Sequence, residues 1–223
     1  MVNITEKKKI NVVFLLVLLS CLTIQVYGFS DGLCMGKVVG LTGQVTIGSE
    51  DIKPDSFLYG NMFESINVGD DSSLEIILPP QFAFGNDYDG IIELESNTEI
   101  IPNIYTTDSK EKEWWKGENI DEVKDKTIIY IIDLNKGKAN IRMSYNCMKY
   151  IDIFQFVCGD YDAVRNPRGG IIIDTSNSKD LDISIEVRES KLLVTVNTGK
   201  VKVFDRKDID KTLSTGEIAE FDI

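Results

Sequence analysis

Short runs in which apolar and polar residues alternate fill the chain from about residue 36 to its end. Most runs are four or five residues long, and Gly, Asn, Asp or Pro residues stand between them. A period of two is typical of strands with one buried face, and the residues between the runs favour turns. The runs expected to form strands are 44–47, 74–78, 91–94, 171–173, 192–196, 201–204 and 217–221. The pattern therefore predicts an all-β domain of many short strands.

One run of five residues has no polar position at all. Residues 128–132 read Ile-Ile-Tyr-Ile-Ile, and β-branched and aromatic residues of this kind favour strands. Because successive side chains point to opposite faces of a sheet, this run predicts a strand that is buried on both faces. The run 74–78 instead ends at Pro79 and Pro80, which cannot continue a ladder of hydrogen bonds.

A small element recurs three times, in residues 36–39, 137–141 and 199–203. Each copy begins with Gly-Lys and continues into an apolar or alternating run. The glycine permits a tight turn, and the lysine faces solvent where the next strand begins. The spacings are unequal, so the element is no fixed-period repeat. It predicts similar β-turn-β units that stack into a rolled or solenoid-like β-sandwich.

Residues 108–126 interrupt the β pattern with a dense mixture of acidic and basic residues around Trp114 and Trp115. We expect a loop with a short exposed helix, inserted between two strands. Adjacent tryptophans on a helix point in different directions, so one core face cannot bury both. Either an exposed ring contacts a partner, a glycan or a membrane surface, or one ring caps an open end of the sheets.

The N-terminus has the pattern of a secretion signal. Lys7, Lys8 and Lys9 precede an apolar run over residues 12–24, and residues 26–28 fit a signal-peptidase site. The run has about 13 residues, whereas a membrane-spanning helix needs about 20. We therefore expect a signal helix in residues 1–28, a linker in residues 29–35 and a mature domain in residues 36–223, exported to the periplasm or cell envelope, or secreted.

Two other interpretations of the leader stay open. Residues 18–21 read Leu-Leu-Ser-Cys, which is similar to a lipoprotein processing site at which Cys21 would carry the lipid. Leu19 and the apolar residues beyond Cys21 fit that pattern poorly. The segment is also a candidate for an uncleaved anchor. Either would hold the domain at a membrane.

Charge and composition exclude several functions. The formal net charge is −12 at pH 7, with 36 acidic and 24 basic residues, so the body of the protein repels a phosphate backbone and no nucleic-acid partner is expected. The chain has no histidine, which excludes Ser-His-Asp and Cys-His catalysis. The four cysteines form no close pair of the kind that binds zinc. We expect no metal and no cofactor.

Two cysteines are candidates for a disulfide. Cys147 and Cys158 flank an aromatic and apolar run that suits a hairpin, and an oxidising compartment favours a bridge between them. It would close a loop of about 12 residues and contribute roughly 3 kcal/mol. Two buried thiols in a reducing compartment are the alternative. Cys34 has no evident partner.

Three sets of polar residues are candidates for binding or catalysis. Arg165 and Arg168 lie on either side of an Asn-Pro turn and would clamp a carboxylate, although a solvated turn explains them more simply. Residues 86–90 resemble part of a calcium loop but lack its glutamate, so a turn is the better interpretation. Carboxylate pairs for glycoside cleavage cannot be selected among so many acidic residues.

Five segments together resemble the FecR domain family, in the order in which that family has them. They are residues 36–45, 66–78, 93–99, 134–138 and a tail made up of 194–203 and 213–217. They contain the Gly-led turn, the Glu-Leu-x-x-Asn-Thr-Glu strand and the final Val-x-x-Gly-x-Val-x-Val strand pair. The resemblance spans nearly all of 36–223. The chain departs from the family at its Val-Arg-Gly-Thr step, which corresponds to residues 164–167 with Arg168 displaced beyond it.

The resemblance implies an all-β extracytoplasmic domain of the kind used in iron-uptake signalling. Only eleven residues precede the apolar run, so we expect a stand-alone FecR-like module rather than a complete signalling regulator. The expected function is non-catalytic interaction with an envelope protein, through an exposed strand edge or through the insertion that contains Trp114 and Trp115. A lipoprotein that binds cell-wall glycan and a carboxylate-dependent hydrolase are the alternatives.

Overall fold

The structure is a computed structural model of the 223-residue chain. It describes the ranges 34–60, 64–79, 85–107, 127–149, 153–158, 169–173, 180–205 and 211–223, together with residues 81 and 151. By its contacts the chain divides into two units, Met1–Gly32 and Leu33–Ile223. The first unit, which holds the expected signal segment, lies outside the described residues. Of the helices in the described ranges, none is long and apolar enough to cross a bilayer.

The second unit consists of two sheets of short strands, as the alternating pattern predicts. Sheet A is antiparallel, and its described strands follow one another in the order β4 (Phe57–Tyr59), β1 (Cys34–Thr42), β6 (Ser73–Ile77), β7 (Gly90–Leu94), the second half of β9 (Thr127–Met143), β12 (Leu181–Arg188), β13 (Lys191–Thr198) and β16 (Ile218–Asp222).

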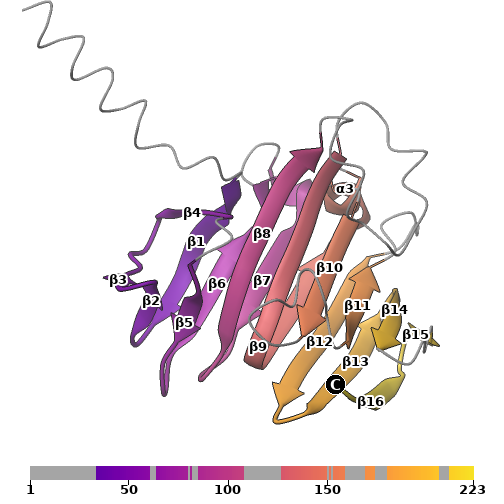
Figure 1. The fold of residues 1–223 in the computed structure, drawn as a ribbon. Coiled ribbons are helices and arrows are strands. Elements are labelled where there is room, and N and C mark those ends of the chain that lie inside the picture. The colour runs from indigo at the N-terminus through magenta and orange to yellow at the C-terminus, as the bar shows by residue number, and fades with distance from the viewer. Residues whose placement is uncertain are drawn as a thin grey trace, which may run out of the picture. The chain divides into compact units, whose positions relative to one another are not determined.

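In sheet B, too, the strands run from N-terminal ones at one edge to C-terminal ones at the other. Its order is β3 (Glu50–Asp51), β2 (Val45–Ile47), β5 (Ile66–Val68), β8 (Glu99–Thr107), the first half of β9, β10 (Ile153–Cys158), β11 (Gly169–Ile173), β14 (Lys200–Asp205) and β15 (Lys211–Ser214). Among the described strand pairs, β9–β10 alone is parallel. Two short helices, η1 (Asn86–Tyr88) and α3 (Tyr145–Met148), complete the described elements. Figure 1 shows the chain advancing from its N-terminal strands at one end to β16 at the other.

The chain passes from one sheet to the other at a series of corners, which produces the expected rolled sandwich. Gly43, Gly137 and Gly199 stand at three of these corners with φ values of 70°, 86° and 95°. Such values are open to glycine at little cost. Two of the three recurring Gly-Lys elements therefore mark corners, as predicted. The third does not, because Gly36 lies inside β1 and a side chain there would strike the backbone of Ile77.

Hydrogen bonds tie neighbouring corners together. The Thr98 hydroxyl, which is 1% exposed, accepts from the Lys138 amide at 2.9 Å and donates to the Lys138 carbonyl at 3.1 Å. Ser72 accepts from the Gln44 amide at 2.9 Å, and Ser96 donates to the Ser72 carbonyl at 3.0 Å. These hydroxyls satisfy backbone groups that the sheet ladders leave open at the bends.

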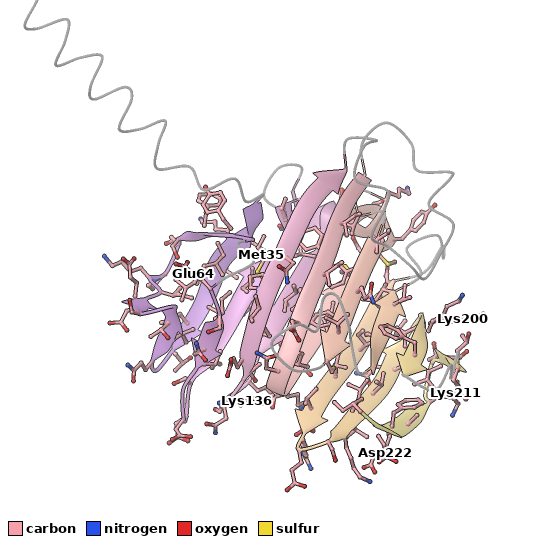
Figure 2. The ribbon with its side chains drawn as sticks, in the orientation of Figure 1. Met35, Glu64, Lys136, Lys200, Lys211 and Asp222 are labelled. Carbon is pink, nitrogen blue, oxygen red and sulfur yellow. The ribbon has the colours of Figure 1, made fainter. Side chains whose placement is uncertain are left out.

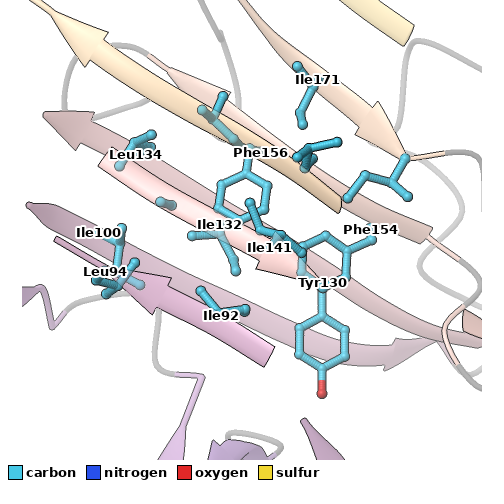
Figure 3. Packing of buried hydrophobic residues seen from close by; sticks show 14 of the residues in the cluster. Ile92, Leu94, Ile100, Tyr130, Ile132, Leu134, Ile141, Phe154, Phe156 and Ile171 are labelled. Carbon is cyan, nitrogen blue, oxygen red and sulfur yellow. The ribbon is translucent and has the colours of Figure 1, made fainter. Parts of the chain in front are cut away.

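A single core lies between the two sheets. Its buried side chains alternate along the strands and come from both layers, such as Ile92 and Ile141 from sheet A and Ile132 and Phe156 from sheet B (Figure 3). The rings of Tyr130 and Phe154 stack with their centroids 5.3 Å apart. The sheets are therefore held together mainly by the burial of apolar surface.

The structure confirms that residues 128–132 belong to a strand buried on both faces. Ile129, Tyr130, Ile131 and Ile132 are each at most 3% exposed. The strand is longer than expected, because β9 continues through the corner at Gly137 into sheet A. The run after Cys147 is not a hairpin: α3 is followed by β10, a single strand that pairs in parallel with β9. The insertion 108–126 lies between β8 and β9, outside the described residues.

Candidate interaction surfaces

The outer face of sheet A carries opposite charges on neighbouring strands. Arg142 donates to Glu93 at 2.5 Å, and Lys138 donates to Glu95 at 2.6 Å. Burial acts to raise the pKa of Glu95, but hydrogen bonds from Lys138 and Asn140 lower it below the ordinary value. Exposed pairs of this kind contribute little stability and are typical of a surface in contact with water.

The outer face of sheet B is different in character. Ile129, Ile131 and Val157 are each at most 3% exposed and form a second apolar cluster, against which Ile153 and Phe204 pack. These residues lie on the side of the sheet away from the main core, because they alternate with core residues such as Tyr130 and Phe156. Sheet B is thus largely apolar on both faces at its centre.

Three buried polar side chains lie within this apolar outer face. Asn103, Asp133 and Gln155 are 2%, 2% and 4% exposed, and each has an oxygen without a hydrogen-bond partner. Ile131 pairs with both Asn103 and Gln155, and Asp133 is two residues further along β9 on the same face. Burial, with a smaller contribution from Glu99, raises the pKa of Asp133 to about 7. Unpaired buried acceptors are costly, so this cluster is a weak point of the fold.

The described edge strands differ in how far they are protected against pairing with another chain. On one side of the molecule, β3 has two residues, and β4 has three and follows Pro54. On the other side, β15 has four residues and β16 has five. Short length and proline are common devices that block an edge. β16 has neither, and its pairing with β13 runs without a shift of register.

The hydrogen-bond pattern shows which backbone groups of β16 are open. The Ile223 amide donates to the Ser190 carbonyl at 2.8 Å, and the Val196 amide donates to the Glu217 carbonyl at 2.9 Å. In an antiparallel ladder such pairs recur at every second residue, so Ala219 and Phe221 also turn their backbone groups toward β13. The amides and carbonyls of Ile218, Glu220 and Asp222 therefore point toward the free edge.

The side chains along this edge are exposed. Ile218 is 67% exposed, which is the highest value among the large exposed hydrophobic residues described. Glu220 forms an ion pair with Lys191, and Asp222 lies directly across from the same lysine. Figure 2 marks Asp222 at the C-terminal end of the sheets, where Lys200 and Lys211 also lie. The β16 edge, defined as Ile218–Asp222, is thus a regular and accessible row of backbone donors and acceptors.

Most of the site residues expected from the sequence lie outside the described residues. These are Trp114, Trp115, Arg165, Arg168 and Cys21. Their proposed roles stay predictions. The strand expected over residues 217–221 is present as β16, but its position at an edge of sheet A depends on strand order, which the local pattern does not give.

The expected disulfide between Cys147 and Cys158 is absent, and both residues are buried free thiols. The reason is their placement. Cys147 is in α3, and its sulfur packs closely on Gly90 of sheet A. A Cβ added at Gly90 would lie 2.5 Å from the Cys147 sulfur. Cys158 is on β10 of sheet B and pairs with Gly169. Burial, followed by the charge of Asp89, raises the pKa of Cys147 to about 12, and burial also raises that of Cys158.

No group of three or more acidic or cysteine side chains in the described ranges is arranged to hold a metal ion. Residues 86–90, which resemble part of a calcium loop, form η1 and the first residue of β7. The interpretation of this segment as a turn agrees with that arrangement.

Comparison with known proteins gives a likeness in structure only. No family model matches the chain, and no curated protein matches it. Two crystal structures, at 1.65 and 2.50 Å resolution, are similar to it; both are of a protein from Parabacteroides distasonis ATCC 8503 described as a proposed anti-sigma factor. In each case the identity is 14%, the TM-score is 0.41, and the match covers 71% of this chain and 59% of the other. The chain thus spans somewhat more than half of the length of that protein.

Proposed function

We propose that the protein is a non-catalytic interaction module of the cell envelope, and that it binds a partner protein by adding a strand to the β16 edge. The observation that carries this proposal is the open edge itself. Three residues present backbone donors and acceptors outward, and Ile218 stands beside them 67% exposed. Strand addition needs these features and no catalytic group.

The sequence supports the location. The lysine cluster and apolar run of residues 7–24 have the pattern of an export signal, and the five FecR-like segments resemble extracytoplasmic domains. Export is tested by fractionating cells that produce the full chain. The protein should be found in the periplasm or envelope, and recovery from the cytoplasm with the leader intact would contradict this part of the proposal.

A single backbone group offers a sharp test of binding. Glu220→Pro removes an amide that points to the free edge, and it should leave the hydrogen bonds between β16 and β13 intact. Glu220→Ala is the matched control, since it removes the same ion pair with Lys191 but keeps the amide. Far-UV circular dichroism and thermal unfolding should show that both variants fold.

The full chain and both variants would be crosslinked in the cell envelope, and the captured proteins would be quantified by mass spectrometry. We expect the Glu220→Ala variant to capture the same partners as the wild type. The Glu220→Pro variant should capture at least about tenfold less, because a blocked edge cannot accept a strand. Equal capture by both variants would show that the edge is not the binding surface.

A further inference from the structure

We infer that the strand added to β16 belongs to a different protein and has basic side chains facing outward and apolar side chains facing inward, antiparallel to β16. This inference rests on the proposed function and specifies the partner. Every strand pair of sheet A is antiparallel, so an antiparallel addition continues the sheet.

The inward side of the edge calls for apolar residues. Ala219 and Phe221 face the core, where Phe221 is 9% exposed and Ala219 is only partly buried against the main cluster. In the described part of the chain no strand lies beyond β16, so these two side chains lie at the border of the core there. Residues opposite them on an added strand would extend the core and bury further apolar surface.

The outward side calls for positive charge. Glu220 and Asp222 are both exposed on this side, and among the described residues Glu220 forms an ion pair with Lys191. Opposite charges on directly facing strands are favourable, and like charges are unfavourable. Basic residues are therefore expected opposite Glu220 and Asp222, and an apolar residue opposite Ile218.

In an antiparallel pairing, the partner strand runs from the residue opposite Asp222 to the residue opposite Ile218. Its five residues are then expected to be basic, apolar, basic, apolar and apolar, in that order. Residues 200–204 of this chain, Lys-Val-Lys-Val-Phe, have that order and form the strand β14. In β14 both valines are at most 1% exposed and face the core. A segment of this kind is thus compatible with the sandwich and gives the design of a probe.

A second copy of the chain fits the edge poorly. Antiparallel pairing of two β16 strands about a twofold axis at Glu220 places Glu220 opposite Glu220 and Ile218 opposite Asp222. Both contacts are unfavourable. A shift of register toward Ile218 brings the turn residue Gly216 into the pairing, which leaves few hydrogen bonds.

The test uses two short peptides with blocked ends and a fluorophore, Thr-Lys-Val-Lys-Val-Phe-Thr and Thr-Glu-Val-Glu-Val-Phe-Thr, titrated into the full chain by fluorescence anisotropy. The basic peptide should bind at least about tenfold more tightly than the acidic one, and added salt should weaken its binding. Glu220→Pro should weaken binding of the basic peptide at least about tenfold, whereas Asp222→Asn should weaken it by about twofold to fivefold.

The inference is overturned if the acidic peptide binds as well as the basic one, or if the basic peptide does not bind at concentrations up to about 1 mM. A dimer in sedimentation experiments that Glu220→Pro abolishes would also overturn it, in favour of a second copy. If envelope capture still depends on the edge in these cases, the proposed function stands and only the partner's chemistry is wrong. Capture that does not depend on the edge contradicts the proposed function itself.

Discussion

Asp133 should make the protein less stable as the pH rises, and Asp133→Asn should remove this effect. The carboxyl group is 2% exposed among the apolar residues of the outer face of sheet B, and burial raises its pKa from 3.8 to about 7. Near pH 4 and below, the side chain is protonated in the folded chain. Between pH 4 and pH 7 the unfolded chain releases this proton and the folded chain keeps it, so the free energy of unfolding falls.

The magnitude follows from the difference between the two pKa values. One pKa unit corresponds to 1.36 kcal/mol, so the full effect above pH 7 is at most roughly 4 kcal/mol. Relaxation of the surroundings reduces this, and we expect roughly 2–4 kcal/mol. An asparagine carries no charge and adds two donors, which can pair with the free oxygens of Asn103 or Gln155. The variant should therefore be more stable than the wild type at pH 8.

Urea unfolding followed by far-UV circular dichroism, at intervals from pH 4.5 to pH 8.5, measures the effect. The wild-type free energy of unfolding should fall more steeply with pH than that of Asp133→Asn, and the two curves should diverge most above pH 7. Asp51→Asn, at an exposed carboxylate of β3, is the control and should follow the wild type. Parallel curves for the wild type and Asp133→Asn would refute the reasoning.

Two further predictions concern the corners and the thiols. Gly137→Ala should lower the free energy of unfolding in urea by more than about 2 kcal/mol, because φ is 86° and the added Cβ would lie 2.5 Å from Thr98. Gly216→Ala is the control, since φ there is 85° but no atom lies within 4 Å of the added Cβ, and it should cost only about 1 kcal/mol. Equal losses in the two variants would contradict a crowded corner at Gly137. Cys147 and Cys158 should resist iodoacetamide in the folded chain and react once unfolded, and reductant should leave the melting temperature unchanged. A Cys147–Cys158 disulfide found in a non-reducing digest would contradict the structure.

The strands could be predicted from the sequence because each is a local pattern. Residues 91–94 and 192–196 alternate between a buried and a partly buried face, and the structure places them in β7 and β13 as expected. Gly137 and Gly199 were also recognisable as turns. Their further role, to carry a strand from one sheet to the other, depends on what lies across the corner, as with Thr98 beside Gly137.

The disulfide predicted between Cys147 and Cys158 shows that a local sequence pattern does not predict which segments meet in the fold. Ten residues separate Cys147 from Cys158, and a hairpin would have brought them together. The parallel pairing of β10 with β9 instead takes Cys158 into sheet B, while Cys147 stays in α3 against Gly90 of sheet A. The buried face around Asp133 was missed for a similar reason. Asp133 follows an apolar run, and only the pairing with β8 and β10 surrounds it with Asn103, Gln155 and Val157.

The most direct test of the account is amide hydrogen exchange along β16, measured by NMR on the full chain. The amides of Ile218, Glu220 and Asp222 should exchange quickly in the free protein, whereas those of Ala219 and Phe221 should be protected by β13. Adding the basic peptide should slow exchange at Ile218, Glu220 and Asp222. Strong protection of these three amides in the free protein, or no change when the peptide is added, would contradict an open edge that accepts a partner strand.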